Sequence, residues 1–101
     1  MKFLVITKRR PNPLPVETME PARQWINAGL ANGTLDCCYG FLNGGGVSIM
    51  NAKSHEDLVT ALMDYPESRW VDFEIEGLCD INMLFEHAEK LAVERGLKKA
   101  S

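Results

Sequence analysis

Residues 2–7 read KFLVIT, a run of strand length that is continuously apolar from Phe3 to Ile6. Phe3 and Val5 alternate with Leu4 and Ile6, so a strand built from this run is apolar on both faces. Such a strand belongs in the middle of a sheet and needs cover on each side. The remaining elements of the chain must therefore supply that cover.

The elements that follow are predicted from two periodicities. Apolar residues spaced three and four apart indicate helices, and strict alternation indicates strands. Ser54 and Asp80 stand where N-caps belong, and the glycines of 44–46 suit a hairpin turn. These patterns predict helices over 18–33, 54–65 and from 80 onward, and strands over 34–42, 46–52 and 70–78.

This order predicts an α+β fold with ferredoxin-like β-α-β-β-α-β topology: an antiparallel sheet, helices on one face, and a C-terminal helix. The length of 101 residues fits a single domain over 1–101. In that topology strands 2–7 and 46–52 are central. Because two helices cover one face only, the second apolar row of strand 2–7 would be left open. We therefore expect a homodimer or a higher oligomer, with sheet packed against sheet.

Composition excludes several classes of partner. The net charge is −3 and no long basic run occurs, which argues against nucleic acid or an anionic membrane surface as a partner. The chain holds three cysteines without C-x-x-C spacing, so we expect no disulfide framework and a cytoplasmic location. Its two histidines form no ligand-spaced pair, so no metal site is predicted.

A family resemblance rests on residues 40–79. GFLNGGGVSIMNAKSHEDLVTALMDYP followed by WVDFEIEGL resembles the muconolactone isomerase-like group of the dimeric α+β barrel superfamily. The resemblance implies a dimer, or an assembly of dimers, whose sheets face each other and enclose small-molecule cavities. The chain departs from the isomerase at Asp36–Tyr39 and at Cys79–Ile81, where that enzyme has an aromatic-arginine pair and a His-Pro segment. Muconolactone isomerisation itself is therefore not predicted.

A row of acids in WVDFEIEGL supplies the candidate catalytic residues. Asp72, Glu74 and Glu76 alternate with Val71, Phe73 and Ile75, so they share the face that a partner sheet would cover. Mutual repulsion and burial would both favour the protonated acid, which prepares a carboxyl group for proton transfer near neutral pH. The alternative is that an edge strand carries acids to avoid aggregation.

Substrate-binding candidates lie at the ends of the first and last strands and on the first helix. Lys8 and Arg69 could attract an anionic ligand, although clusters of surface charge usually have little effect. Trp25 and Trp70 could form apolar walls, and Tyr39 could donate its hydroxyl group. Aromatic residues at such positions are more often part of the core.

The leading functional hypothesis is a small-metabolite-binding protein with cofactor-free, isomerase-type chemistry. Glu74 and Asp72 would carry the proton, and Tyr39 would donate a hydrogen bond. The competing hypothesis is a non-catalytic ligand-binding or assembly module of the same fold. Composition and spacing leave open whether the chain is an enzyme.

Overall fold

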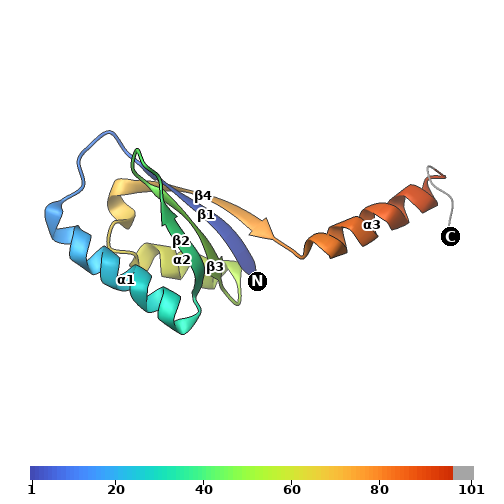
Figure 1. The fold of residues 1–101 in the computed structure, drawn as a ribbon, viewed down its shortest axis with the longest axis horizontal. Helices are drawn as coiled ribbons and strands as arrows, with labels where there is room; N and C mark the ends of the chain where they lie inside the picture. The colour runs from blue at the N-terminus through green and yellow to red at the C-terminus, as the bar shows by residue number, and fades with distance from the viewer. Residues whose placement is uncertain (97–101) are drawn as a thin grey trace.

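The computed structural model describes residues 1–96, and its strands form one four-stranded sheet. Figure 1 shows helices on one face of this sheet and the C-terminal helix standing apart. The elements are β1 (Lys2–Arg9), α1 (Met19–Asn32), β2 (Leu35–Gly40), β3 (Gly46–Asn51), α2 (His55–Asp64), β4 (Val71–Leu78) and α3 (Ile81–Glu94), with short 3-10 turns η1 (Val16–Thr18) and η2 (Ser68–Trp70).

The sheet has the predicted ferredoxin-like topology. Its strand order is β2-β3-β1-β4, and every neighbouring pair is antiparallel. Strand β1 therefore lies in the interior of the sheet, as its two apolar faces predict. It pairs with β3 through Val5–Ser48 and with β4 through Val5–Ile75.

Local signals set the helix boundaries where the sequence predicted them. The Ser54 hydroxyl accepts a hydrogen bond from the Asp57 backbone N–H at 3.1 Å and caps α2. Gly33 ends α1 in the left-handed region at φ +85°, which glycine adopts without steric cost. At the other end of the chain, the Asp80 carboxylate caps α3. The predicted strand 70–78 begins one residue later, because Trp70 ends η2.

The core lies between the sheet and helices α1 and α2. Its buried members come from β1, β2, β3 and α2: Phe3, Val5, Leu35, Met50, Leu58 and Leu62. The apolar stripes predicted for the helices are narrower than expected, because Leu30, Val59 and Met63 are exposed. The helix residues that do pack against the core include Trp25 and Ile26 on α1 and Leu58 and Leu62 on α2.

The other face of the sheet is not covered by any of residues 1–96. The register places Leu4 opposite Ile49 and Ile6 opposite Val47, and all four are only half-buried. We call this surface the open face. This face is open because α1 and α2 both lie on the other side of the sheet, as the topology predicted.

Helix α3 extends away from the rest of the chain (Figure 1), and none of its side chains is buried. The extents of 60 × 29 × 23 Å reflect this projection. Within residues 1–96, no helix combines the length and the apolar character that crossing a membrane requires.

Candidate functional site

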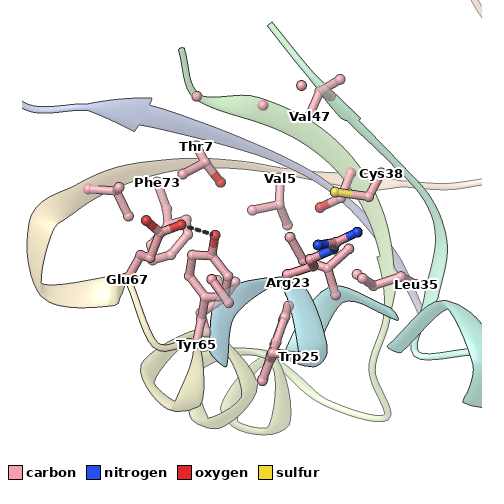
Figure 2. A pocket seen from close by; sticks show the side chains of 18 of the residues that line it. Val5, Thr7, Arg23, Trp25, Leu35, Cys38, Val47, Tyr65, Glu67 and Phe73 are labelled. Atoms are coloured by element: carbon pink, nitrogen blue, oxygen red, sulfur yellow. Dashed lines mark hydrogen bonds between the residues drawn. The ribbon is translucent and has the colours of Figure 1, made fainter. Parts of the chain in front are cut away.

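A cavity of about 480 Å³ lies between the helix-covered face of the sheet and α1 (Figure 2). This volume is within the range of small-molecule sites, which are mostly apolar with a few polar groups. The apolar part of its lining comes from the sheet, from α1 and α2 and from the loop before α1: Val5, Leu14, Trp25, Ile26, Leu62 and Phe73. Such walls favour a ligand with a substantial apolar part.

The polar pair inside the cavity is Tyr65 with Glu67. Both belong to the connection between α2 and β4, where Pro66 separates them. The Tyr65 hydroxyl donates a 2.8 Å hydrogen bond to Glu67 Oε1 (Figure 2). Its ring packs edge-to-face on Trp25 and on Phe73, at centroid distances of 5.0 and 6.4 Å. Aromatic packing on two sides therefore holds the hydroxyl in position against the carboxylate.

Burial raises the pKa of Tyr65 well above its ordinary value, and the hydrogen bond to Glu67 raises it further. The phenol is therefore a neutral donor at physiological pH. The folded chain holds this proton more tightly than the unfolded chain does. The contribution of Tyr65 to the free energy of unfolding is therefore fully present below about pH 10, the ordinary tyrosine value, and is lost as the pH rises above it.

This titration gives a first prediction. In the Tyr39→Phe variant, the remaining phenol is expected to stay protonated above about pH 10 until the chain unfolds, as followed by near-ultraviolet absorbance. The Tyr65→Phe variant is expected to lose less stability between neutral and alkaline pH than the wild type. Ionisation of Tyr65 at the ordinary pH in a folded chain would contradict the buried hydrogen bond.

Two residues with guanidinium groups also line the cavity. Arg9, at the end of β1, lies across the hairpin turn, since a Cβ built on Gly44 would come 2.5 Å from Arg9 Cδ. Arg9 forms no ion pair with any residue among 1–96. Arg23 on α1 lies 3.9 Å from Glu20, and both side chains are largely exposed, so the pair neutralises little of the Arg23 charge. Both cations are available to an anionic ligand.

Cys38 on β2 faces the cavity from the sheet (Figure 2). Burial raises the pKa of its thiol, and the neighbouring Cys37 adds to the rise. A thiol that resists ionisation is a poor nucleophile, so Cys38 serves as a wall. Within residues 1–96, no group of three or more His, Cys, Asp and Glu side chains is arranged to hold a metal ion.

The residues predicted from sequence lie in three places. Trp25 lies in the cavity. Glu74 and Asp72 lie on the open face, on the other side of the sheet from the cavity. There Lys8 Nζ is 2.6 Å from Glu74 Oε1, and Arg10 Nε is 3.0 Å from Asp72 Oδ1. Both pairs are solvent-exposed in the single chain.

Tyr39 shares the open face with Glu74 but is not brought close to it. The register runs Tyr39–Val47–Ile6–Glu74 across all four strands, and neighbouring strands are about 4.8 Å apart, which separates the two ends of this row by roughly 14 Å. Tyr39 is 68% exposed and its strand position also borders the cavity rim.

Arg69 and Trp70 lie in η2 and are not among the described residues that line the cavity. The Arg69 carbonyl oxygen accepts a 2.7 Å hydrogen bond from Arg10 Nη1, which ties the turn to the end of β1. The sequence analysis proposed Arg69 as a cation that attracts an anionic ligand and Trp70 as an apolar wall. Two other residues with guanidinium groups, Arg9 and Arg23, line the cavity.

Sequence reasoning missed the cavity's own polar residues, Tyr65, Glu67 and Arg23. Tyr65-Pro66 served only as a stop signal for the second helix, and Glu67 follows it in a loop. A signal was nevertheless available, because Tyr65 and Glu67 are two residues apart in the connection that leads to an edge strand. Both residues therefore lie near the same end of the sheet. Nothing in the spacing tells which face they occupy.

The chain was compared with known proteins. No family model matches it, and no curated protein matches it. Among solved structures it is similar to muconolactone isomerase, with 21% identity, a TM-score of 0.67, and coverage of 79% of this chain and 90% of that one.

A second similar structure is the 5-chloro-2-hydroxyhydroquinone dehydrochlorinase of Burkholderia phenoliruptrix, solved in complex with 2,5-dihydroxybenzoquinone. It shows 18% identity and a TM-score of 0.55, over 78% of this chain and 94% of that one. The predicted fold and the resemblance to muconolactone isomerase-like structures are confirmed. At these identities the likeness concerns the fold alone.

Proposed function

We propose that this protein binds a small, partly apolar, anionic metabolite in the cavity and catalyses a cofactor-free proton transfer on it, of isomerase type. The observation that carries the proposal is the composition of the cavity: apolar walls, one carboxylate–phenol pair, and two guanidinium groups. Of the two similar structures, one is an isomerase by name and the other was solved with a small ring compound bound.

The chemistry follows from the pair. Glu67 accepts a proton from a ligand carbon next to a carbonyl group and returns it to another carbon of the same ligand, so that the net reaction is an isomerisation. Tyr65 holds one Glu67 oxygen through its hydrogen bond and leaves the other free of that bond. Arg9 and Arg23 attract the ligand's negative charge toward the rim.

The catalytic role predicted for Glu74 and Asp72, with Tyr39 as donor, remains a second candidate. These residues are on the open face, so this site exists only if a second copy covers them. A non-catalytic protein that binds the same kind of ligand in the cavity remains the alternative to an enzyme.

We also propose that the chain forms a homodimer through its open face. Leu4, Ile6, Val47 and Ile49 form an apolar centre there, and the Lys8–Glu74 pair lies at its margin. Exposed apolar surface of this kind marks an interaction site more often than a free surface. Analytical ultracentrifugation at low micromolar concentration tests it, and a well-folded single chain would contradict it.

A thermal-shift screen tests ligand binding. Carboxylated lactones, aromatic acids and acyl carboxylates are offered at increasing concentration to the wild-type chain. A ligand present at about ten times its Kd stabilises the native state by about 1.4 kcal/mol, which raises Tm by roughly 5 °C or more in a chain of this size. No shift from any of these classes would contradict the proposed ligand class.

Two arginine variants then locate the ligand. Arg23→Ala is expected to weaken binding of an anionic ligand by roughly five- to tenfold, because it removes a charge-assisted hydrogen bond worth about 1 kcal/mol at an exposed site. Arg95→Ala, which removes the same charge far from the cavity, is the control and should leave the shift unchanged. Equal weakening by both variants would indicate a general charge effect.

A further inference from the structure

The helix-covered face of the sheet changes from large apolar to small polar side chains where the cavity begins. On β1 the buried Phe3 and Val5 are followed on the same side by Thr7. On β3 the buried Met50 is preceded on the same side by Ser48. Thr7 and Ser48 are half-buried, and both line the cavity. Two hydroxyl groups therefore stand in the floor of the cavity, where the two central strands elsewhere present core side chains.

The two hydroxyl-bearing residues are neighbours across adjacent strands. Thr7 pairs with Gly46, and Ser48 lies two residues further along β3 on the same side of the sheet. Such diagonal neighbours have Cβ atoms roughly 7 Å apart or less. One oxygen atom that accepts a hydrogen bond of about 2.8 Å from each hydroxyl group fits between side chains at this separation. Gly46 has no side chain to fill the space beside them.

Both hydroxyl groups are available to a ligand. Neither has a hydrogen-bond partner among residues 1–96, and in this part of the chain no side-chain oxygen or nitrogen is enclosed without one. The hydroxyl groups of Thr7 and Ser48 are therefore open to the space of the cavity that they line. A hydroxyl group is both a donor and an acceptor, and it carries no charge of its own.

The floor and the Tyr65–Glu67 pair face the same space. Thr7 pairs with Phe73 on β4, and the Phe73 ring packs on the Tyr65 ring. Figure 2 shows the Thr7 side chain projecting from β1 into the cavity that Tyr65 and Glu67 also enter. A ligand in the cavity is therefore bounded by hydroxyl groups on the sheet side and by a carboxylate on the side of the α2–β4 connection.

The proposed proton transfer needs donors of this kind. When Glu67 takes a proton from a carbon next to a carbonyl group, the electron pair of the broken C–H bond forms a C=C bond, and the carbonyl oxygen becomes an enolate oxygen. The negative charge on that oxygen is stabilised by donors already in place. Tyr65 does not supply one, because its proton is bound to Glu67. Return of the proton to a carbon atom restores the carbonyl group, so the sequence consumes nothing.

We propose that Thr7 and Ser48 bind the carbonyl oxygen of the ligand and stabilise its enolate form. Arg9 lies two residues beyond Thr7 on the same side of β1, about 7 Å along the strand. The ligand class is therefore a carboxylate with a ketone group separated from the carboxylate by a short apolar spacer. This inference rests on the proposed function and adds the site for the second oxygen group of the ligand.

A matched pair of acids tests the contact in binding. The probes are 4-oxo-4-phenylbutanoate and 4-phenylbutanoate, which differ only in the ketone group. Thr7→Val and Ser48→Ala, which each remove one hydroxyl group, are expected to weaken binding of the keto acid about three- to tenfold in isothermal titration calorimetry. Both should leave binding of 4-phenylbutanoate within about twofold, because that acid lacks the oxygen atom. Equal weakening of both acids, or of neither, would overturn the carbonyl site.

Thermal unfolding and a second threonine provide the controls. Thr7→Val keeps the shape of the side chain and removes an unpaired hydroxyl group from a mostly apolar cavity, so its Tm should not fall below that of the wild type. Thr7→Ser retains the hydroxyl group and should bind the keto acid within about threefold of the wild type. Thr34→Val, outside the cavity lining, should leave both acids unchanged. Weakening by Thr7→Ser as large as by Thr7→Val would contradict a role of the hydroxyl group.

Hydrogen exchange tests the contact in the reaction. The wild type in D₂O is expected to exchange the hydrogens next to the ketone of 4-oxo-4-phenylbutanoate, as followed by proton NMR. Thr7→Val and Ser48→Ala should each slow this exchange by at least about tenfold, because each removes a donor to the enolate. If Glu67→Gln abolishes the exchange while these two variants leave it unchanged, the proton transfer stands and the carbonyl site falls. No exchange by the wild type would contradict the proposed function itself, and the carbonyl site with it.

Discussion

The Gly45→Ala variant is expected to be about 2–4 kcal/mol less stable than the wild type. Gly45 has φ +78°, a left-handed conformation that costs an L-residue about 1–2 kcal/mol. A methyl group there would also lie 2.3 Å from the backbone oxygen of Thr7. That oxygen belongs to β1 beside the Thr7–Gly46 pairing, so relief of the clash must disturb the central strand.

Gly33→Ala is the control for this experiment. Gly33 has φ +85°, but a methyl group there meets nothing within 4 Å. The substitution is therefore expected to lower the free energy of unfolding only by the strain of the left-handed backbone, about 1–2 kcal/mol. Urea unfolding of both variants, at equal m-values, measures the difference. Equal losses would show that the hairpin turn moves aside freely and that the contact with β1 is not a constraint.

Glu67→Gln is expected to lower turnover of a ligand found by the thermal-shift screen by about 10²- to 10⁴-fold, the usual contribution of a general acid–base group. Binding should change far less, because the amide keeps the shape of the side chain and can still accept the Tyr65 hydrogen bond. Progress curves under saturating ligand measure the first effect, and the thermal shift measures the second.

Glu74→Gln is the matched variant on the other side of the sheet, and it decides between the two candidate sites. Glu74 is exposed and paired with Lys8, so its loss should leave turnover within about twofold if the cavity is the active site. If Glu74→Gln abolishes turnover and Glu67→Gln does not, the proton carrier is on the open face. Retained ligand binding without turnover in the wild type would favour the non-catalytic alternative.

Much of the fold was predictable because its signals are local. The run KFLVIT specified an interior strand, Ser54 and Asp80 specified helix starts, and Gly33 specified a helix end. Helix stripes were predicted less well, because adjacent apolar residues such as Leu58 and Val59 cannot both face the sheet. Spacing shows which side of a helix is apolar, and packing decides how wide a stripe is buried.

The candidate site was predicted less well than the fold, and the reason is the two-sided nature of a sheet. Alternation correctly placed Asp72 and Glu74 together on one face, but it carries no information on where the cavity lies. The cavity is on the helix-covered face, where the α2–β4 connection brings Tyr65 against Trp25 and places Glu67 in the lining. Arg23 reaches it from α1, a different part of the chain.

By itself, the sequence determined the strand and helix types, their order, and the need for cover on a second apolar face. These properties depend on residues close to one another along the chain. Only the tertiary structure decided which polar side chains share a cavity, which acids are paired with cations in the open, and that α3 leaves the body. Those outcomes depend on distances between segments far apart in sequence, which no local periodicity encodes.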